Sequence, residues 1–143
     1  MAGFRFYHLI EVRYGDLDPQ GHLNNAKYLT FIEQARIQYI KYLGLWDGGS
    51  FLNIGIILAD VHITFRSPIH FGQPVRVGVR VSRLGSKSLN MEFRLEDASS
   101  GEELASGSTV SVAYDYHARK TIPLPENWRN AITNYESLGI EEP

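Results

Sequence analysis

The sequence predicts an α+β fold, a single domain in which one long central α-helix is wrapped by a curved antiparallel β-sheet of about five strands. One strand-like segment precedes the only long helical pattern, and four more follow it with short, turn-rich links. The helix is also apolar around most of its circumference. Because short links favour antiparallel neighbours and an apolar helix must be enclosed, the simplest burial wraps the sheet around the helix.

The first strand is predicted over residues 4–14, where apolar and polar side chains alternate. The long helix is predicted over Asn25–Leu43, because apolar residues recur there at three- and four-residue spacing. Asn24 or Asn25 suits its N-cap, and Gly44 suits the stop after its last turn.

Alternating patterns predict four later strands and a C-terminal pattern predicts a short helix, all within one domain of residues 1–143. The strands are expected around residues 60–66, 75–81, 89–95 and 110–115, and the helix at about 126–138.

Composition excludes several classes of function. The chain has no cysteine, which rules out disulfides, thiolate zinc sites and cysteine nucleophiles. A net charge of −2 gives no general attraction to nucleic acid. No apolar run reaches the ~18 residues of a membrane span, and no secretory signal is recognised, so we expect a cytoplasmic protein. The sheet edge and the remaining apolar surface indicate a homodimer or homotetramer.

The segment between the first strand and the helix carries the chemistry. From Asp16 to Asn25 it holds two carboxylates, one histidine and two asparagines. Acyl transfer needs such groups: a carboxylate to attack or to activate water, and backbone N–H donors to hold an oxyanion.

Residues 15–28, Gly-Asp-Leu-Asp-Pro-Gln-Gly-His-Leu-Asn-Asn-Ala-Lys-Tyr, with Phe31, Glu33 and Arg36 after them, resemble the 4-hydroxybenzoyl-CoA thioesterase-like branch of the hotdog superfamily. Their pattern is also similar to the core of plant-type acyl-ACP thioesterases. The resemblance implies a dimer or tetramer of hotdog domains with active sites at subunit interfaces. It implies as substrate the acyl thioester of CoA or of acyl-carrier protein, with no metal or redox cofactor.

The resemblance also assigns roles within this segment. Asp18 aligns with the catalytic carboxylate, which acts either as a nucleophile that forms a mixed anhydride or as a general base on water. Backbone amides of the helix N-terminus near Asn25 would polarise the thioester carbonyl. His22 and Asn24 match residues proposed as catalytic or orienting, although a structural role would equally suit His22. Asp16 is interpreted as a support of the loop.

Candidate substrate-binding residues lie further along the chain. Tyr28 could line an acyl pocket or belong to the core. Cations and hydroxyls at strand ends and in a hairpin could bind the phosphates of CoA or phosphopantetheine, or could simply be solvated. These residues are Arg66, Arg83, Ser86, Lys87 and Ser88. Glu33 is expected to be solvated or salt-bridged at the surface, and none of the five histidines has zinc-ligand spacing.

The leading hypothesis is therefore hydrolysis of an acyl-CoA or acyl-ACP thioester to a free carboxylic acid and a thiol. A hotdog dehydratase or hydratase is one alternative, but the arrangement of histidine and acid that those enzymes use is not found. A non-catalytic protein that binds acyl-CoA or another apolar ligand is the other alternative.

Overall fold

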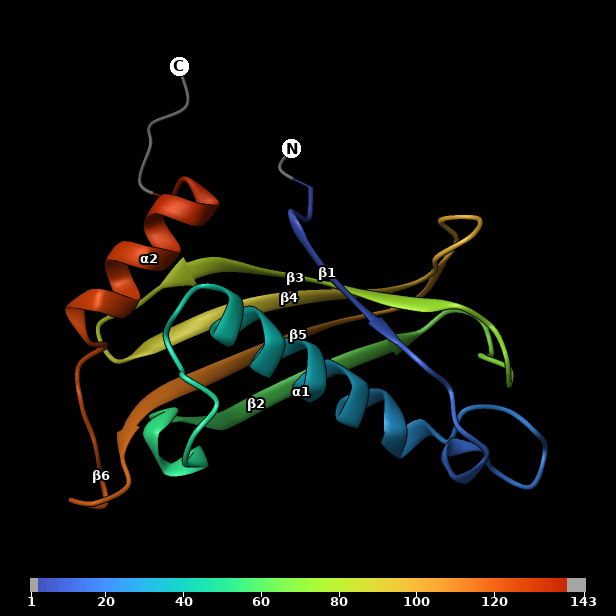
Figure 1. Ribbon diagram of the computed structural model, residues 1–143, viewed down its shortest axis with the longest axis horizontal. Coiled ribbons are helices and arrows are strands. Elements are labelled where there is room, and N and C mark those ends of the chain that lie inside the picture. The colour runs from blue at the N-terminus through green and yellow to red at the C-terminus, as the bar shows by residue number, and fades with distance from the viewer. Residues whose placement is uncertain (1–2, 139–143) are drawn as a thin grey trace.

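A curved antiparallel sheet wraps one long helix in the computed structural model of the protein, which describes residues 3–138 (Figure 1). The strands run in the order β1-β3-β4-β5-β2, and short β6 pairs with β5. Their bounds are β1 Phe6–Ile10, β2 Ile56–Phe65, β3 Val75–Leu84, β4 Ser88–Asp97, β5 Glu103–Asp115 and β6 Lys120–Thr121. The helices are α1 Asn25–Tyr42 and α2 Glu126–Glu136. The predicted fold class is confirmed.

Helix α1 begins and ends almost where its sequence predicts. The side-chain oxygen of Asn24 accepts the Ala26 N–H at 2.9 Å, which makes Asn24 the N-cap. The helix ends at Tyr42, and Gly44 follows with φ of +77°. Six of its side chains are buried: Tyr28, Phe31, Ile32, Ala35, Tyr39 and Ile40.

The prediction of a first strand over residues 4–14 is wrong in its extent. β1 pairs with β3 only from Phe6, opposite Val79, to Ile10, opposite Val75. β3 starts at Val75 directly after Pro74, so the chain beyond Ile10 has no ladder partner there. By contrast, β2 and β5 both begin earlier than predicted, because they pair with each other along almost the whole length of β2.

The core lies between α1 and the concave face of the sheet. The predicted apolar faces of β3 and β4 are confirmed, since alternate residues of both strands are buried: Val75, Val77, Val79, Val81, Leu89, Met91, Phe93 and Leu95. In the second half of β5, however, the small residues Thr109, Ser111 and Ala113 are buried instead of Val110 and Val112. A Cβ on Gly107 would lie 3.2 Å from Cδ1 of Ile32, which shows how closely α1 passes over this strand.

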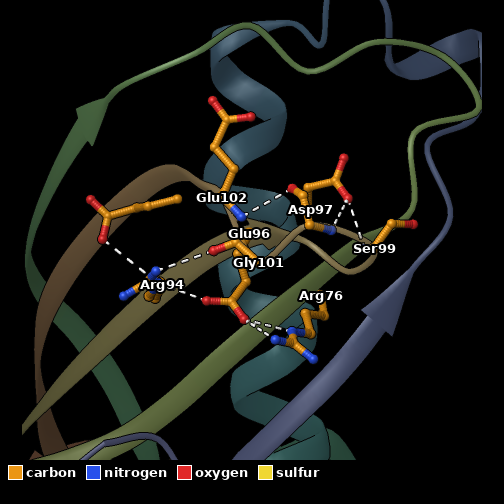
Figure 2. A network of polar contacts seen from close by, with 9 residues as sticks. Arg76, Arg94, Glu96, Asp97, Ser99, Gly101 and Glu102 are labelled. Carbon is orange, nitrogen blue, oxygen red and sulfur yellow. Dashed lines mark hydrogen bonds and ion pairs between the residues drawn. The ribbon is translucent and has the colours of Figure 1, made fainter.

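The convex face of the sheet is crossed by ion pairs (Figure 2). Glu96 is only 3% exposed, and its carboxylate lies 2.5 Å from Arg76 Nη2 and 2.7 Å from Arg94 Nε. Glu103 extends the series, since it lies 3.7 Å from Arg94 and 3.0 Å from Arg66. A buried carboxylate between two guanidinium groups has the charge partners that burial requires.

Helix α2 is tied to the core through one carboxylate. The buried Tyr39 hydroxyl donates to Oε2 of Glu136 at 2.6 Å, and the Val81 N–H donates to the same oxygen at 3.0 Å. β1 begins opposite Val79 and therefore does not reach Val81, which leaves this amide to α2. The helix ends at Glu136 rather than 138, because Ser137 adopts a left-handed conformation with φ of 59°.

Replacing Glu136 with leucine should lower the free energy of unfolding by about 2 kcal/mol, because the Tyr39 hydroxyl and the Val81 amide would both lose their acceptor. Glu136→Gln keeps an acceptor oxygen and should cost less. Urea unfolding of both variants, with exposed Asn134→Ala as the control, checks this. Equal stability of the leucine and glutamine variants would contradict it.

Candidate active site

The loop that joins β1 to α1 lines an open cavity of about 300 Å³ at the end of the sheet where β2 ends and β5 begins. Figure 1 shows this loop in blue, beside the N-terminus of α1. The cavity brings together five of the predicted site residues with Phe65. These five are Asp18, His22, Asn25, Tyr28 and Arg66.

The carboxylate of Asp18 is held by backbone amides. Its Oδ1 accepts the N–H of Gln20 at 2.9 Å and that of His22 at 3.2 Å, and the Asp18 N–H donates to the His22 carbonyl at 2.8 Å. Gly21 completes the turn with φ of +81°, a conformation that costs glycine little. Among the described residues Oδ2 has no hydrogen-bond donor, so one oxygen is anchored and the other is available for chemistry.

The N-terminus of α1 offers one amide to the cavity. Asn24 uses its side-chain oxygen for the Ala26 N–H, and its carbonyl accepts the Lys27 N–H at 2.8 Å. The Asn25 N–H has no acceptor among the described residues, and Asn25 lines the cavity with Asp18. Asn24 is thus a cap that orients the helix end. The backbone of Asn25 is the group that could receive an oxyanion.

Asp16 supports the loop, in agreement with the prediction from the sequence. Its carboxylate is 1% exposed, accepts the Arg13 N–H at 2.9 Å, and lies 3.3 Å from Arg13 Nη2 and 3.9 Å from Lys27 Nζ. Burial alone would raise the pKa of Asp16, but the hydrogen bonds and charge of Arg13 outweigh it, so this pKa lies below its ordinary value.

A second segment holds the loop from the other side. The Leu23 N–H donates to the Ile69 carbonyl at 2.7 Å, and His22 and His70 form an antiparallel bridge with ring centroids 5.0 Å apart. Sequence reasoning did not single out His70 for the site. No spacing signal in the sequence connects His70 to His22.

Tyr28 belongs to both the core and the cavity. Its ring is buried and packs edge-on against Phe65, with centroids 4.8 Å apart. Burial, with a further contribution from the negative charge of Asp18, raises the pKa of the Tyr28 hydroxyl. Tyr28 therefore stays protonated beside Asp18 at neutral pH, as an aromatic wall with a hydroxyl group.

The predicted phosphate-binding residues lie in two places. Arg66 is in the cavity wall, with its Nε 3.0 Å from Glu103. The other four, Arg83, Ser86, Lys87 and Ser88, lie at the β3–β4 hairpin, at the opposite end of the sheet (Figure 1). β4 spans ten residues between these ends, which corresponds to ~33 Å. A role of these four residues in binding substrate stays a prediction.

Glu33 forms the expected salt bridge, at 3.6 Å from Arg36. Within residues 3–138 no cluster of three or more histidine and acidic side chains could hold a metal ion. Independence from metal and redox cofactors stays a prediction. No helix in this part of the chain is long and apolar enough to cross a membrane.

A curved sheet around one helix, with an amide-held aspartate beside the helix N-terminus, defines the hotdog class of thioester enzymes. The family model of the thioesterase-like superfamily matches residues 12–132, and the chain belongs to this family. The predictions of a hotdog thioesterase family and of an enzyme of this class are confirmed at the level of the family.

Relatives and solved structures agree with this assignment. A Thermus thermophilus thioesterase, solved with coenzyme A and zinc, is 36% identical with a TM-score of 0.83, covering 96% of this chain and 98% of that one. The long-chain acyl-CoA thioesterase FadM of Escherichia coli is 26% identical over 86% of this chain and 93% of its own length. The 1,4-dihydroxy-2-naphthoyl-CoA hydrolase of Synechocystis is 23% identical over 88% and 93%.

Asp16→Asn should lower the free energy of unfolding by about 1–2 kcal/mol at neutral pH, because a buried charged acceptor is lost. Since the folded pKa of Asp16 is depressed, its contribution is full above the ordinary value of 3.8 and is lost as the pH falls through the folded pKa. Unfolding of wild type and variant from pH 7 to pH 3 should show their difference shrinking in acid. Exposed Asp47→Asn is the control, and a constant difference would contradict the assignment.

Proposed function

We propose that this protein hydrolyses acyl-CoA thioesters to a carboxylic acid and free CoA, with Asp18 as the reacting carboxylate. The observation that carries this proposal is the fixed orientation of Asp18, whose anchored Oδ1 leaves Oδ2 free in the cavity that Asn25 also lines. CoA is the proposed thiol carrier because the FadM and Synechocystis relatives are named for acyl-CoA substrates. We propose no separate role for acyl-carrier protein.

The chemistry needs two groups, a carboxylate that faces the thioester carbon and an N–H donor that faces its carbonyl oxygen. Oδ2 of Asp18 attacks this carbon, or removes a proton from a water that attacks it. As the carbonyl oxygen gains negative charge, it accepts a hydrogen bond from the Asn25 N–H. The positive end of the helix dipole stabilises the same charge. The C–S bond then breaks and the thiolate leaves, after which water opens the mixed anhydride if Asp18 was the nucleophile. Rapid quenching followed by mass spectrometry would reveal that anhydride as an acyl adduct.

Asp18→Asn should reduce kcat by roughly a thousandfold or more, because an amide is neither a nucleophile nor a base at neutral pH. The asparagine oxygen can still accept both backbone N–H bonds, so folding should be kept. The measurement is thiol release from short, medium, long and aromatic acyl-CoAs, where the absence of cysteine in the chain keeps the background low.

Asp115→Asn is the matched control for this measurement. Oδ1 of Asp115 also accepts two backbone N–H bonds, from His117 at 2.9 Å and Ala118 at 3.0 Å, but outside the cavity. Its variant should hydrolyse acyl-CoA normally. Undiminished turnover by Asp18→Asn would refute its assigned role, and saturable binding without thiol release across the panel would favour a ligand-binding protein.

We also propose that β2 pairs with a second copy of the chain. β2 is the last strand of the sheet, and its side chains Ile57, Val61 and Phe65 are 42%, 39% and 48% exposed. An exposed apolar edge strand is a ready template for another strand. Phe65 and Arg66, at the end of β2, also line the Asp18 cavity, so such a dimer would close it from outside.

Val61→Lys should shift the mass measured by light scattering from at least two copies to one, because a charge would be buried in the interface. Ser99→Lys, in the exposed β4–β5 hairpin, is the control and should leave the mass unchanged. A Val61→Lys protein that remains a dimer would place the interface elsewhere.

A further inference from the structure

The loop that carries Asp18 rests on the β2–β3 loop, which links the end of β2 to the start of β3. Ile69 in the β2–β3 loop is fully buried, and its carbonyl accepts the Leu23 N–H at 2.7 Å. The next residue, His70, forms the antiparallel bridge with His22. His22 in turn binds Asp18 through its N–H, at 3.2 Å, and through its carbonyl, at 2.8 Å. The position of Asp18 therefore follows the position of the β2–β3 loop.

Gln73 holds the β2–β3 loop through both ends of its side-chain amide. Its Oε1 accepts the His70 N–H at 3.0 Å, and its Nε2 donates to Oδ2 of Asp97 at 3.0 Å. The Gln73 N–H also donates to the His70 carbonyl at 3.1 Å, which closes the turn. Only one orientation of the amide meets an N–H donor on one side and a carboxylate on the other. Gln73 thus connects the residue that bridges to His22 with Asp97.

Asp97 is itself well anchored, in the hairpin between β4 and β5 (Figure 2). Its Oδ1 accepts the N–H groups of Ser99 at 2.8 Å and of Ser100 at 3.0 Å. Its own N–H donates to the Glu102 carbonyl at 2.9 Å. Hydrogen bonds, above all the one from Gln73, hold the pKa of Asp97 below its ordinary value, so Asp97 is a charged acceptor at neutral pH. The hairpin therefore offers Gln73 a fixed point of attachment.

We propose that Gln73 is a positioning residue that sets the place of Asp18 without touching the substrate. The inference rests on the proposed acyl-CoA hydrolysis and adds to it a residue that does not line the cavity. His70 is exposed, so water can replace a lost bond to its N–H and the fold should persist without Gln73. Attack by a carboxylate is sensitive to displacements of about 1 Å. A displaced β2–β3 loop should therefore slow the chemical step and leave the binding of acyl-CoA unchanged.

The test exchanges donor and acceptor across the contact between Gln73 and Asp97. Gln73→Glu sets two carboxylates against each other, and Asp97→Asn must turn an N–H group either on Gln73 or on the hairpin amides. In the double variant the new carboxylate accepts from the His70 N–H and from the new amide, so each bond is made again. With the acyl-CoA that wild type hydrolyses fastest, each single variant should lower kcat by about tenfold at unchanged KM. The double variant should recover most of this loss.

Amide hydrogen exchange gives a readout that does not depend on activity. Protection of the Leu23 N–H, which binds the β2–β3 loop, should fall in both single variants and return in the double variant. Asn134→Asp is the matched control, because it makes the same change from amide to carboxylate on the exposed side of α2, at the opposite end of the sheet (Figure 1). It should keep both kcat and the protection of Leu23.

Unchanged kcat in Gln73→Glu would overturn the inference and leave the proposed function standing. A loss that the double variant does not restore, or one in which KM rises as kcat falls, would also overturn it, since Gln73 would then have only a general structural role. If Gln73→Glu does not fold, Gln73→Met decides, because it removes both bonds without adding a charge and should likewise lower kcat alone. No turnover of any acyl-CoA by wild type would overturn both proposals.

Discussion

The close packing of α1 on the concave face of the sheet is the constraint on which the rest of the structure depends. A side chain at position 107 would crowd its neighbours, because a Cβ on Gly107 would lie 3.1 Å from the His62 carbonyl and 3.2 Å from Cδ1 of Ile32. The buried residues that follow it along β5 are also small. This packing fixes the depth of the helix and so the positions of Asn25 at the cavity and Tyr39 under α2. Catalysis by positioning is sensitive to displacements of about 1 Å, so this packing bears on the catalytic geometry that we propose at Asp18.

The loop that carries Asp18 is fixed mainly through backbone atoms. The Asn24 N–H donates to the Asp16 carbonyl at 2.9 Å, and Leu23 is bound to Ile69. Asp16, with its two cations, holds the start of the loop. Because these bonds use main-chain groups and one structural carboxylate, Asp18 is left with a free oxygen. The two acids, two residues apart, thus differ: Asp16 is a buried support, and Asp18 keeps the free oxygen that we propose as the reacting group.

How much the sequence predicts depends on whether the deciding contacts are local. The bounds of α1 follow from Asn24 and Gly44, and the core faces of β3 and β4 follow from alternation alone. The length of β1 depends on where β3 starts, after Pro74, which is distant in sequence. The inner face of β5 carries small residues because a helix lies over it, and composition gives no signal for that. In the site, Asp18 and Asn25 were predictable from one motif, whereas His70 reaches His22 only through the folded chain.

Contacts between residues distant in sequence also separate the cations that the sequence groups as candidate phosphate-binding residues. Arg66 ends the series of ion pairs on the convex face, where three arginines share two glutamates and one positive charge remains in excess. Arg66 is half exposed beside the Asp18 cavity, and its predicted contact with the phosphates of CoA would use this charge. Arg83 and Lys87 lie at the other end of β4, a distance that one acyl-CoA bound at Asp18 would have to span along the sheet.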